Sequence, residues 1–218
     1  MRRAQPLRAG TRGRSEGREL ALGRAALLAL WLAACAAKPP PPPPAPAPPP
    51  PEAAAPPPCE RVARLEVRKA AHTLVAECAG GAHLEFPVAL SREKGPKRAA
   101  GDQRVPEGEY RIAGPVRESR FHRFVPIDYP SRKDAVRALA EGRIPRTDHD
   151  AIVAAHRHHR LPPQHTALGG HVGFHGEGER WKGDLRLDWT YGCVAVTDEV
   201  IDWIATRAPR GTPVSIVP

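Results

Sequence analysis

The sequence predicts a mainly β domain of the α+β class, in which mixed β-sheets pack as a sandwich and carry helical insertions. Three observations support this prediction. Residues 59–218 number 160, the length of a single domain that can bury about two-thirds of its unfolded surface. Short segments of alternating apolar and polar residues occur toward both ends of this stretch. Helix-like patterns lie between them.

The predicted strands share an alternation in which every second side chain is apolar. Leu65 and Val67, for example, alternate with Arg64, Glu66 and Arg68, as in a strand with one buried face. The first three strands follow one another closely, which indicates an antiparallel start. The predicted strand segments are residues 64–68, 73–76, 84–88, 110–112, 194–196 and 214–216.

Two helices are expected as an insert over residues 131–163, flanking the cleft and without an assigned catalytic role. Residues 131–134 begin with serine and end with aspartate, a capping-box pattern, and Gly142 ends the helix that follows. Residues 147–150 have threonine and aspartate at the same spacing. They are predicted to cap a second helix that runs up to Pro162-Pro163.

A third helix is expected to open at Asp198 and to end before Pro209. Four apolar residues recur at core spacing between these positions. The two acidic residues at its start suit the positive end of the helix dipole.

The residues that point most directly to chemistry are Phe174-His175-Gly176 and, further on, Thr190-Tyr191-Gly192-Cys193. Cysteine is a nucleophile only as thiolate, so a cysteine behind a glycine in a tight turn needs a group that takes its proton. His175 precedes Cys193 by 18 residues and can take that role. Either residue alone is more often structural, because free cysteine is commonly buried. Together they predict an acyl-transfer site.

Each glycine of this pattern has an expected role. Gly192 permits a backbone conformation that a side chain would forbid, so N–H groups around Gly192 and Cys193 can point at a developing oxyanion. Gly176 lets the chain pass close behind the imidazole of His175, where a backbone carbonyl can fix its tautomer. Thr190 and Tyr191 complete the turn before the nucleophile.

These motifs resemble the L,D-transpeptidase catalytic domain, also called YkuD, in which His-Gly is followed after a spacer by Ser/Thr-x-Gly-Cys. Residues 95–97, Gly-Pro-Lys, and residues 101–110 are similar to two further family segments, with Val105 in place of the usual threonine. Residues 211–216 are similar to the family's closing strand. The similarity runs in order through most of residues 61–218.

The resemblance implies a cysteine-dependent L,D-transpeptidase that acts on peptidoglycan stem peptides through a thioester acyl-enzyme, in cell-wall biogenesis and cell shape. Cys193 would be the nucleophile and His175 the base and then the acid, with no cofactor. Tyr191 stands where many members have histidine, and Ala195 where many have arginine. Related members that hydrolyse murein linkages also have alanine there. A murein hydrolase (amidase or carboxypeptidase) and a non-catalytic wall-binding lipoprotein are the alternatives.

Residues 1–34 are predicted to be a signal peptide. They contain seven arginines against two glutamates, a local charge of +5, followed by the apolar run of residues 25–34. This run is far shorter than the roughly 20 residues of a membrane-spanning helix. Leu32-Ala33-Ala34-Cys35 is similar to a bacterial lipobox, which predicts a lipid on Cys35, with an ordinary signal peptide as the alternative. Alanine at position 36 favours sorting to the outer membrane.

Residues 35–58 are predicted to link this anchor to the domain on the periplasmic side of the envelope. Residues 39–58 contain 14 prolines, which predicts an extended spacer of about 3.1 Å per residue. The chain carries a charge of +9, of which +5 belongs to the leader, so the mature protein is modestly basic. This charge suits an anionic wall polymer, and the lack of a basic helix interleaved with aromatic residues argues against nucleic acid.

The remaining cysteines, Cys59 and Cys78, would lie in an oxidising compartment. If the hairpin turns at Arg68-Lys69, the two face each other within reach of a disulfide. A longer loop through His72 would break that register, so bonded and unbonded states both stay open.

A metal site is the rival to acyl transfer, because six histidines fall within residues 156–175. His156, His158 and His159 lie on the second predicted helix at spacings that do not share one face, and no HExxH motif is present. We therefore expect a solvated helix surface and no metal. His171 is expected to share a strand face with His175 and to line the cleft.

Overall fold

The computed structural model describes residues 59–181, 185 and 187–218. Contacts divide the chain into a unit of residues 1–52 and a unit of residues 53–218, and all of the fold described below belongs to the second. The predicted signal peptide (1–34), the lipid on Cys35 and the proline-rich linker lie outside the described residues. Within the described part, no helix is both long and apolar enough to span a membrane.

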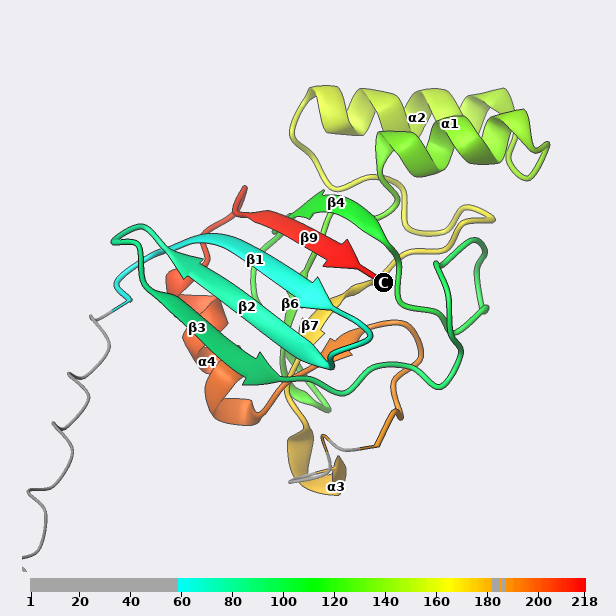
Figure 1. Ribbon diagram of the computed structural model, residues 1–218. Helices are drawn as coiled ribbons and strands as arrows, with labels where there is room; N and C mark the ends of the chain where they lie inside the picture. The colour runs from blue at the N-terminus through cyan, green and yellow to red at the C-terminus, as the bar shows by residue number, and fades with distance from the viewer. Residues whose placement is uncertain (1–58, 182–184, 186) are drawn as a thin grey trace, which may run out of the picture. The chain divides into compact units, whose positions relative to one another are not determined.

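A five-stranded mixed sheet forms the face turned toward the viewer in Figure 1. The four N-terminal strand segments predicted from alternation are confirmed, and the closing strand lies between the first and fourth of them. It pairs with the first strand in parallel and with the fourth antiparallel. In spatial order the strands are β3 (His83–Pro87), β2 (Thr73–Cys78), β1 (Val62–Arg68), β9 (Pro213–Val217) and β4 (Gly108–Arg111).

The second sheet lies behind the first and carries the His-Gly segment. Its β6 pairs antiparallel with β5 and β7, and β7 pairs in parallel with β8. The predicted strand over residues 194–196 is shorter in the structure, because β8 ends before Val196. The strands are β5 (Arg117–Ser119), β6 (His122–Pro126), β7 (Gly173–His175) and β8 (Val194–Ala195).

The hydrophobic core lies between the two sheets, which is the sandwich predicted from the sequence. Leu65 and Val67 of β1 are fully buried, and so are Leu74 and Ala76 of β2. The second sheet contributes Phe174, which belongs to the same cluster. Burial of one such large side chain is worth about 1.5–3 kcal/mol, so alternation along each strand selects the face that turns inward.

Helix α4 (Asp198–Arg207) packs against β6 and β7 and begins where the sequence predicts. The side chain of Thr197 caps it by accepting a hydrogen bond from the N–H of Val200. Ile201 and Ile204 are fully buried in the main core. A further short helix, α3 (Gly178–Trp181), follows β7. Helix α3 thus follows β7, and helix α4 follows β8.

The helical insert is present, and its first helix has the predicted cap. In α1 (Arg132–Ala140) the Ser131 hydroxyl accepts from the N–H of Asp134, whose carboxylate accepts in return from the N–H of Ser131. The helix ends before Gly142, whose φ is +69°. Figure 1 shows α1 and α2 side by side beyond β4, and they share a small core of their own.

The start and end predicted for the second helix are wrong. Helix α2 (Arg146–Arg157) has Pro145 at its N-cap without a side-chain hydrogen bond, so Thr147 lies inside the helix. The connection from the end of α1 to α2 is short, and Pro145, with its fixed φ, is the N-cap of α2, two residues before the predicted cap. His158 is the C-cap, so the helix also ends well before Pro162.

Cys59 and Cys78 form a disulfide with Cα atoms 5.5 Å apart. The register behind the prediction is nevertheless wrong: the β1–β2 hairpin closes on the pair Arg68 and Thr73, so the longer loop through His72 is the one that forms. Cys78 lies opposite Val62 beside a bulge. Cys59 precedes β1 and reaches Cys78 from outside the ladder.

Candidate active site

Cys193 lies at the end of a tight turn that immediately precedes β8. The Thr190 hydroxyl donates to the carbonyl of Cys193 at 2.7 Å and closes the turn. The N–H of buried Thr190 donates to the carbonyl of Leu90 at 3.0 Å, which fixes the turn to the rest of the domain. At Gly192 φ is +117°, and a Cβ there would lie 2.8 Å from the carbonyl oxygen of Arg104. Glycine is therefore required at this position.

His175 ends β7, and Cys193 immediately precedes β8, the strand that pairs with β7 in parallel. Phe174 pairs with Val194, so Cys193 lies level with Gly173, two residues before His175 on the adjacent strand. Because side chains alternate along a strand, the thiol and the imidazole belong to the same face of the sheet. The half-buried Sγ of Cys193 donates to the carbonyl of His171 at 3.5 Å.

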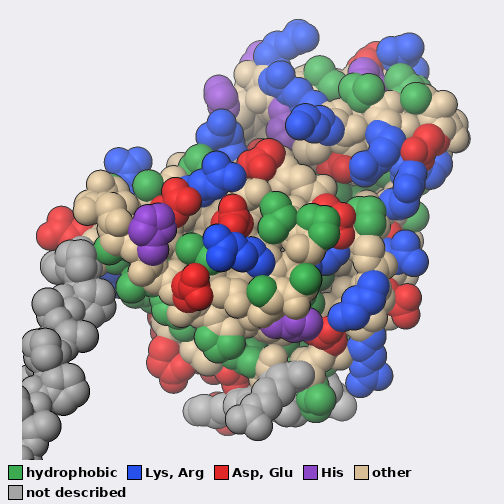
Figure 2. All heavy atoms as spheres, in the orientation of Figure 1, with side chains coloured by type: hydrophobic (Ala, Val, Ile, Leu, Met, Phe, Trp, Pro, Cys, Tyr) green, Lys and Arg blue, Asp and Glu red, His purple; other side chains and the backbone are tan. Residues whose placement is uncertain are grey.

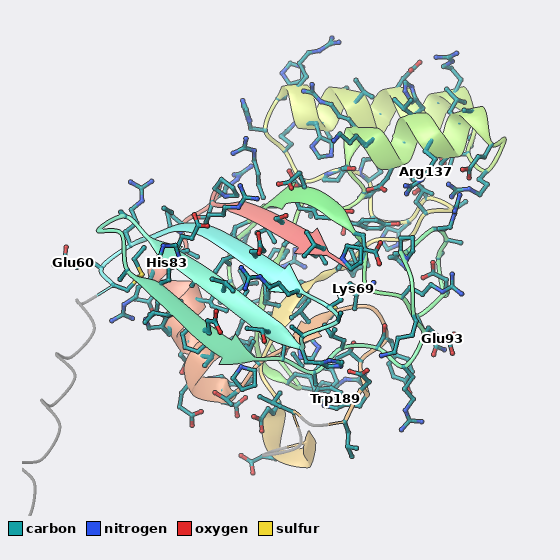
Figure 3. All side chains as sticks on the ribbon, viewed as in Figure 1. Glu60, Lys69, His83, Glu93, Arg137 and Trp189 are labelled. Carbon is teal, nitrogen blue, oxygen red and sulfur yellow. A yellow bond between two sulfur atoms is a disulfide. The ribbon has the colours of Figure 1, made fainter. Side chains whose placement is uncertain are left out.

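The imidazole of His175 is held from three sides. Its Nδ1 lies 2.7 Å from the carbonyl oxygen of Gly176. A carbonyl only accepts, so this hydrogen bond requires the proton on Nδ1 and leaves the lone pair on Nε2. The ring stacks on Phe121 with centroids 4.7 Å apart, and Trp189 lies 5.5 Å away on a third segment, which Figure 3 shows near the α3 end of the domain.

Burial makes the neutral form of both groups the stable one. Desolvation lowers the pKa of His175 below its ordinary value of 6.5, although the Gly176 carbonyl opposes this change. Burial raises the pKa of the Cys193 thiol to about 11, against the opposing effects of the Gly173 N–H and the positive charge of Lys97. At neutral pH the resting site therefore holds a thiol and a neutral imidazole.

Gly176 is held in a space that no other residue fits. A Cβ at this position would lie 2.2 Å from Oδ1 of Asp198 and 2.9 Å from the carbonyl oxygen of Phe121. The same Oδ1 accepts a hydrogen bond from the N–H of Gly178 at 3.1 Å. Asp198, the first residue of α4, thus ties the chain behind the imidazole to the helix.

The sequence reasoning missed three contributors to this site. Phe121 and Trp189 hold the imidazole, and Asp188 anchors the segment that leads into the cysteine turn. Asp188 accepts from Lys94 Nζ at 2.6 Å and from the N–H of Leu90 at 2.9 Å. Burial alone would raise the pKa of Asp188, but these hydrogen bonds and one with His72 hold it below 3.8. No local motif marks any of the three, because their contacts are distant in sequence.

Lys97 of the Gly-Pro-Lys segment is also part of the surroundings of the thiol. It is buried, and its Nζ donates to Asp102 at 2.8 Å and to the carbonyl of Ala99 at 2.9 Å. Asp102 further accepts from the backbone N–H groups of Arg98, Ala99 and Arg104. The Gly-Pro-Lys segment was identified in the sequence only by its resemblance to the family. This network shows its structural role, which is to fix the loop around Asp102.

Two of the residues that depart from the family pattern, Tyr191 and Ala195, have opposite environments. Tyr191 is 73% exposed at the mouth of the turn. Ala195 is fully buried, and its N–H and carbonyl both bond to Ala89. A long charged side chain has no space at position 195 in this arrangement.

The histidines are dispersed, and two predictions about them are wrong: the strand face shared by His171 and His175, and the position of His158 and His159 on the second helix. His171 does not share a strand face with His175: it precedes β7, its φ is +56°, and its ring lies against His165. His158 and His159 lie past the end of α2. Among the described residues no group of three or more His, Cys, Asp or Glu is placed to hold a metal ion.

A comparison with protein families matches residues 63–216 to the YkuD model, the L,D-transpeptidase catalytic domain. The chain therefore belongs to the YkuD family of L,D-transpeptidase catalytic domains. No curated protein sequence matches it.

Similar solved structures include the helical cell shape determining protein Pgp2 from Campylobacter jejuni, with 19% identity and a TM-score of 0.48. Bd1075 from Bdellovibrio bacteriovorus has 20% identity and a TM-score of 0.40. An L,D-transpeptidase from Xylanimonas cellulosilytica has 13% identity and a TM-score of 0.39. These matches cover 71%, 72% and 74% of this chain but only 47%, 48% and 63% of the respective solved chains.

Proposed function

We propose that this protein is a cysteine acyltransferase of the L,D-transpeptidase type that acts on peptidoglycan stem peptides. Family membership supports the class of substrate. The single observation that carries the mechanism is the 2.7 Å contact between Nδ1 of His175 and the carbonyl of Gly176, because it leaves Nε2 of a buried imidazole as a base. Cys193, at the end of the turn before the neighbouring strand β8, is the nucleophile.

The first half of the reaction forms a thioester. Sγ of Cys193 attacks the carbonyl carbon of the donor peptide while Nε2 of His175 takes the thiol proton. The transfer accompanies the attack, because a thiol with a pKa of about 11 is not ionised at rest. N–H groups of Gly192 and Cys193 donate to the oxyanion. His175 then gives its proton to the leaving amine as the peptide bond breaks.

The second half transfers the acyl group. An acceptor amine attacks the thioester carbon and gives a proton to Nε2 of His175. When the carbon–sulfur bond breaks, that proton returns to the sulfur of Cys193, and a new peptide bond remains. The roles of base and acid thus alternate on one imidazole.

A murein hydrolase is the second candidate, and one observation favours it. Ala195 is fully buried where many crosslinking members carry arginine, so this site lacks a guanidinium for an acceptor carboxylate. Water would then resolve the same thioester. The acyl-enzyme itself is common to both candidates.

Incubation with purified murein separates the candidates. Intact mass should detect acylated Cys193, and chromatography should detect an amine-dependent exchange product. An adduct that gives only hydrolysed stems, even with abundant amine, would establish the hydrolase. If no murein fragment forms an adduct, both enzyme candidates are refuted, and a non-catalytic wall-binding protein replaces them.

The proposal includes a lipid-anchored location on the periplasmic side of the outer membrane. Its support is the Leu32-Ala33-Ala34-Cys35 sequence and the proline-rich segment that follows. The disulfide between Cys59 and Cys78 adds support, because such bonds persist in oxidising compartments.

A further inference from the structure

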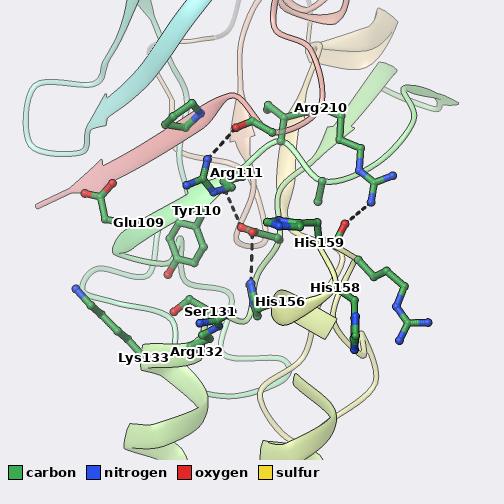
Figure 4. A pocket seen from close by; sticks show the side chains of 16 residues that line it. Glu109, Tyr110, Arg111, Ser131, Arg132, Lys133, His156, His158, His159 and Arg210 are labelled. Atoms are coloured by element: carbon green, nitrogen blue, oxygen red, sulfur yellow. Dashed lines mark hydrogen bonds and ion pairs between the residues drawn. The ribbon is translucent and has the colours of Figure 1, made fainter. Parts of the chain in front are cut away.

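A cavity of about 880 Å³ lies away from the cysteine, between the sandwich and the helical insert. Its wall is formed by β4, the residues around the start of β9, the beginning of α1 and the end of α2 (Figure 4). Neither Cys193 nor His175 lines it. We call this cavity the basic groove. Five of its lining residues are Arg111, Arg132, Lys133, Arg160 and Arg210.

The basic groove has an excess of positive charge. Only two carboxylates, Glu109 and Asp128, line it against the five lysine and arginine side chains. Three histidines, His156, His158 and His159, lie in the same wall. Figure 2 shows Lys, Arg and His side chains gathered at this end of the two helices.

Both carboxylates already have partners. Asp128 accepts from the N–H of Arg111 at 2.7 Å and lies 3.5 Å from Nδ1 of His156. Glu109 accepts from the hydroxyl of Ser215 at 2.9 Å. In Figure 4, dashed lines mark the interactions of Arg111 and His156 with other residues of the lining. Because only two carboxylates face five lysine and arginine side chains, they offset part of this positive charge and leave a net excess of cations in the lining.

Within the part of the chain that the structure describes, none of the five lysine and arginine side chains of the lining forms an ion pair with a carboxylate. Arg111 donates to the carbonyl of Gly211 at 3.1 Å, and Arg210 donates to the carbonyl of His159. Carbonyl oxygens orient these guanidinium groups without cancelling their charge. Lys133 and Arg160 are exposed and make no ion pair there. A concave site with an excess of cations favours an anionic ligand.

We propose that the basic groove is a second binding site, which holds carboxylate groups of a peptide strand of the cell-wall polymer. The inference rests on the proposed function, which supplies a carboxylate-rich peptide as the substrate. Guanidinium groups bind carboxylates through paired hydrogen bonds, and the groove presents four of them from separate segments. The volume lies within the range of sites for small ligands.

The shape distinguishes this ligand from two other anions. A bilayer surface is flat on this scale and cannot enter a cavity between a helix pair and a sheet. Bases of single-stranded nucleic acid stack on aromatic side chains, and Tyr110, the aromatic residue of the lining, is buried against Asp134. A wall polymer bound at the groove would raise the local concentration of stem peptides at Cys193. The residues of the groove would take no part in the reaction itself.

The test uses residues 1–218 with Cys193→Ala, so that bound peptide is not consumed. A second protein adds Lys133→Glu and Arg160→Glu, and a control adds Arg157→Glu, an exposed residue of α2 outside the lining. The probes are a synthetic stem tetrapeptide with free carboxylates, its fully amidated form, inorganic phosphate and phosphatidylglycerol vesicles. Backbone amide resonances of residues 109–113 and 211 report binding at the groove.

We expect the free tetrapeptide to shift these resonances and the double variant to bind it roughly tenfold more weakly, with Arg157→Glu unchanged. The amidated peptide should not bind there. Equal affinity for the amidated peptide, unchanged binding by the double variant, or preference for phosphate or vesicles would each overturn the proposal. Unchanged amide spectra outside the groove verify that the variants are folded.

A parallel measurement separates this inference from the proposed function. With Cys193 intact, the double variant should acylate with a small thioester donor at the wild-type rate, because the groove takes no part in bond formation. Loss of that acylation would show that Lys133 and Arg160 take part in the reaction. It would overturn the proposal that the groove is separate from the catalytic site. Tetrapeptide binding at the groove in a protein whose Cys193 is never acylated would refute only the proposed function.

Discussion

Nδ1 of His175 lies 2.7 Å from the carbonyl oxygen of Gly176, the very next residue of the chain. The base is thus oriented by its own backbone, and this contact needs no third side chain. The arrangement depends on a glycine at position 176, because only then can the chain turn back beside Asp198. The rings of Phe121 and Trp189 complete the hold on the imidazole.

Removal of either proposed catalytic group should abolish murein turnover and leave the fold intact. Cys193→Ser and His175→Ala should each lower the rate by at least roughly 10²–10⁴-fold, because one lacks the nucleophile and the other the proton acceptor. Product chromatography measures the rate, and thermal unfolding should show similar Tm values. Wild-type turnover by Cys193→Ser would refute the mechanism. A metal chelator should have no effect.

The pH profile of acylation should have a single acid limb with its midpoint below 6.5. Burial lowers the pKa of His175, so the neutral base persists on acidification until the pH falls through that lowered value. The thiol, with a pKa of about 11, should show no thiolate absorbance at neutral pH. Rates of alkylation by iodoacetamide provide an independent check. If the Cys193 thiol titrates near neutral pH, the resting site holds a thiolate and a protonated His175 instead, and this prediction is refuted.

Gly176→Ala should destabilise the protein and misplace the base. The added Cβ would lie 2.2 Å from Oδ1 of Asp198, so the strand or the start of α4 must shift. We expect a loss of about 1–3 kcal/mol in the free energy of unfolding, typical of overpacking, together with slower acylation. Gly80→Ala is the matched control, because a Cβ there meets nothing within 4 Å. Equal effects of the two changes would contradict the structure.

Asp188→Asn should loosen the segment that leads into the cysteine turn. The amide is uncharged and has one accepting oxygen in place of two, so it cannot keep the bonds to the Leu90 N–H and to Lys94 together. We therefore expect a loss of about 1–3 kcal/mol in the free energy of unfolding. Because folding lowers the pKa of Asp188, its contribution should be complete above 3.8 and fade as the pH falls below it. Urea unfolding at several pH values measures this. A difference from wild type that does not shrink in acid would disprove the role of its charge.

Cys35→Ala should release the protein from the membrane fraction, since a cleaved leader leaves no anchor once the lipid is missing. Fractionation and mass spectrometry of the peptide that begins at residue 35 provide the measurement. Retention of this variant in membranes, with no lipid on the wild-type peptide, would refute the lipoprotein proposal. Cys59→Ala is a useful comparison, because it removes a disulfide partner instead of the lipid site.

Local chemistry was enough to identify the elements whose signals lie within a few residues. Alternation in residues 64–68 predicts β1 because burial of one face is a property of the strand itself. The capping box at Ser131 predicts the start of α1 for the same reason. The spacing of His175 and Cys193 was sufficient to suggest the family, which the match to residues 63–216 confirms.

Long-range packing decided the rest, because its energy comes from residues far apart in the chain. Nothing near β1 indicates that β9 pairs with it in parallel. His171 has a strand-like spacing from His175, yet the chain bends before β7 to bring its carbonyl to the thiol. Phe121 and the adjacent pair Asp188 and Trp189 support the candidate site from two segments that only folding brings together. The basic groove likewise exists only because the helical insert lies beside β4 and β9, which places cations from five positions around one cavity.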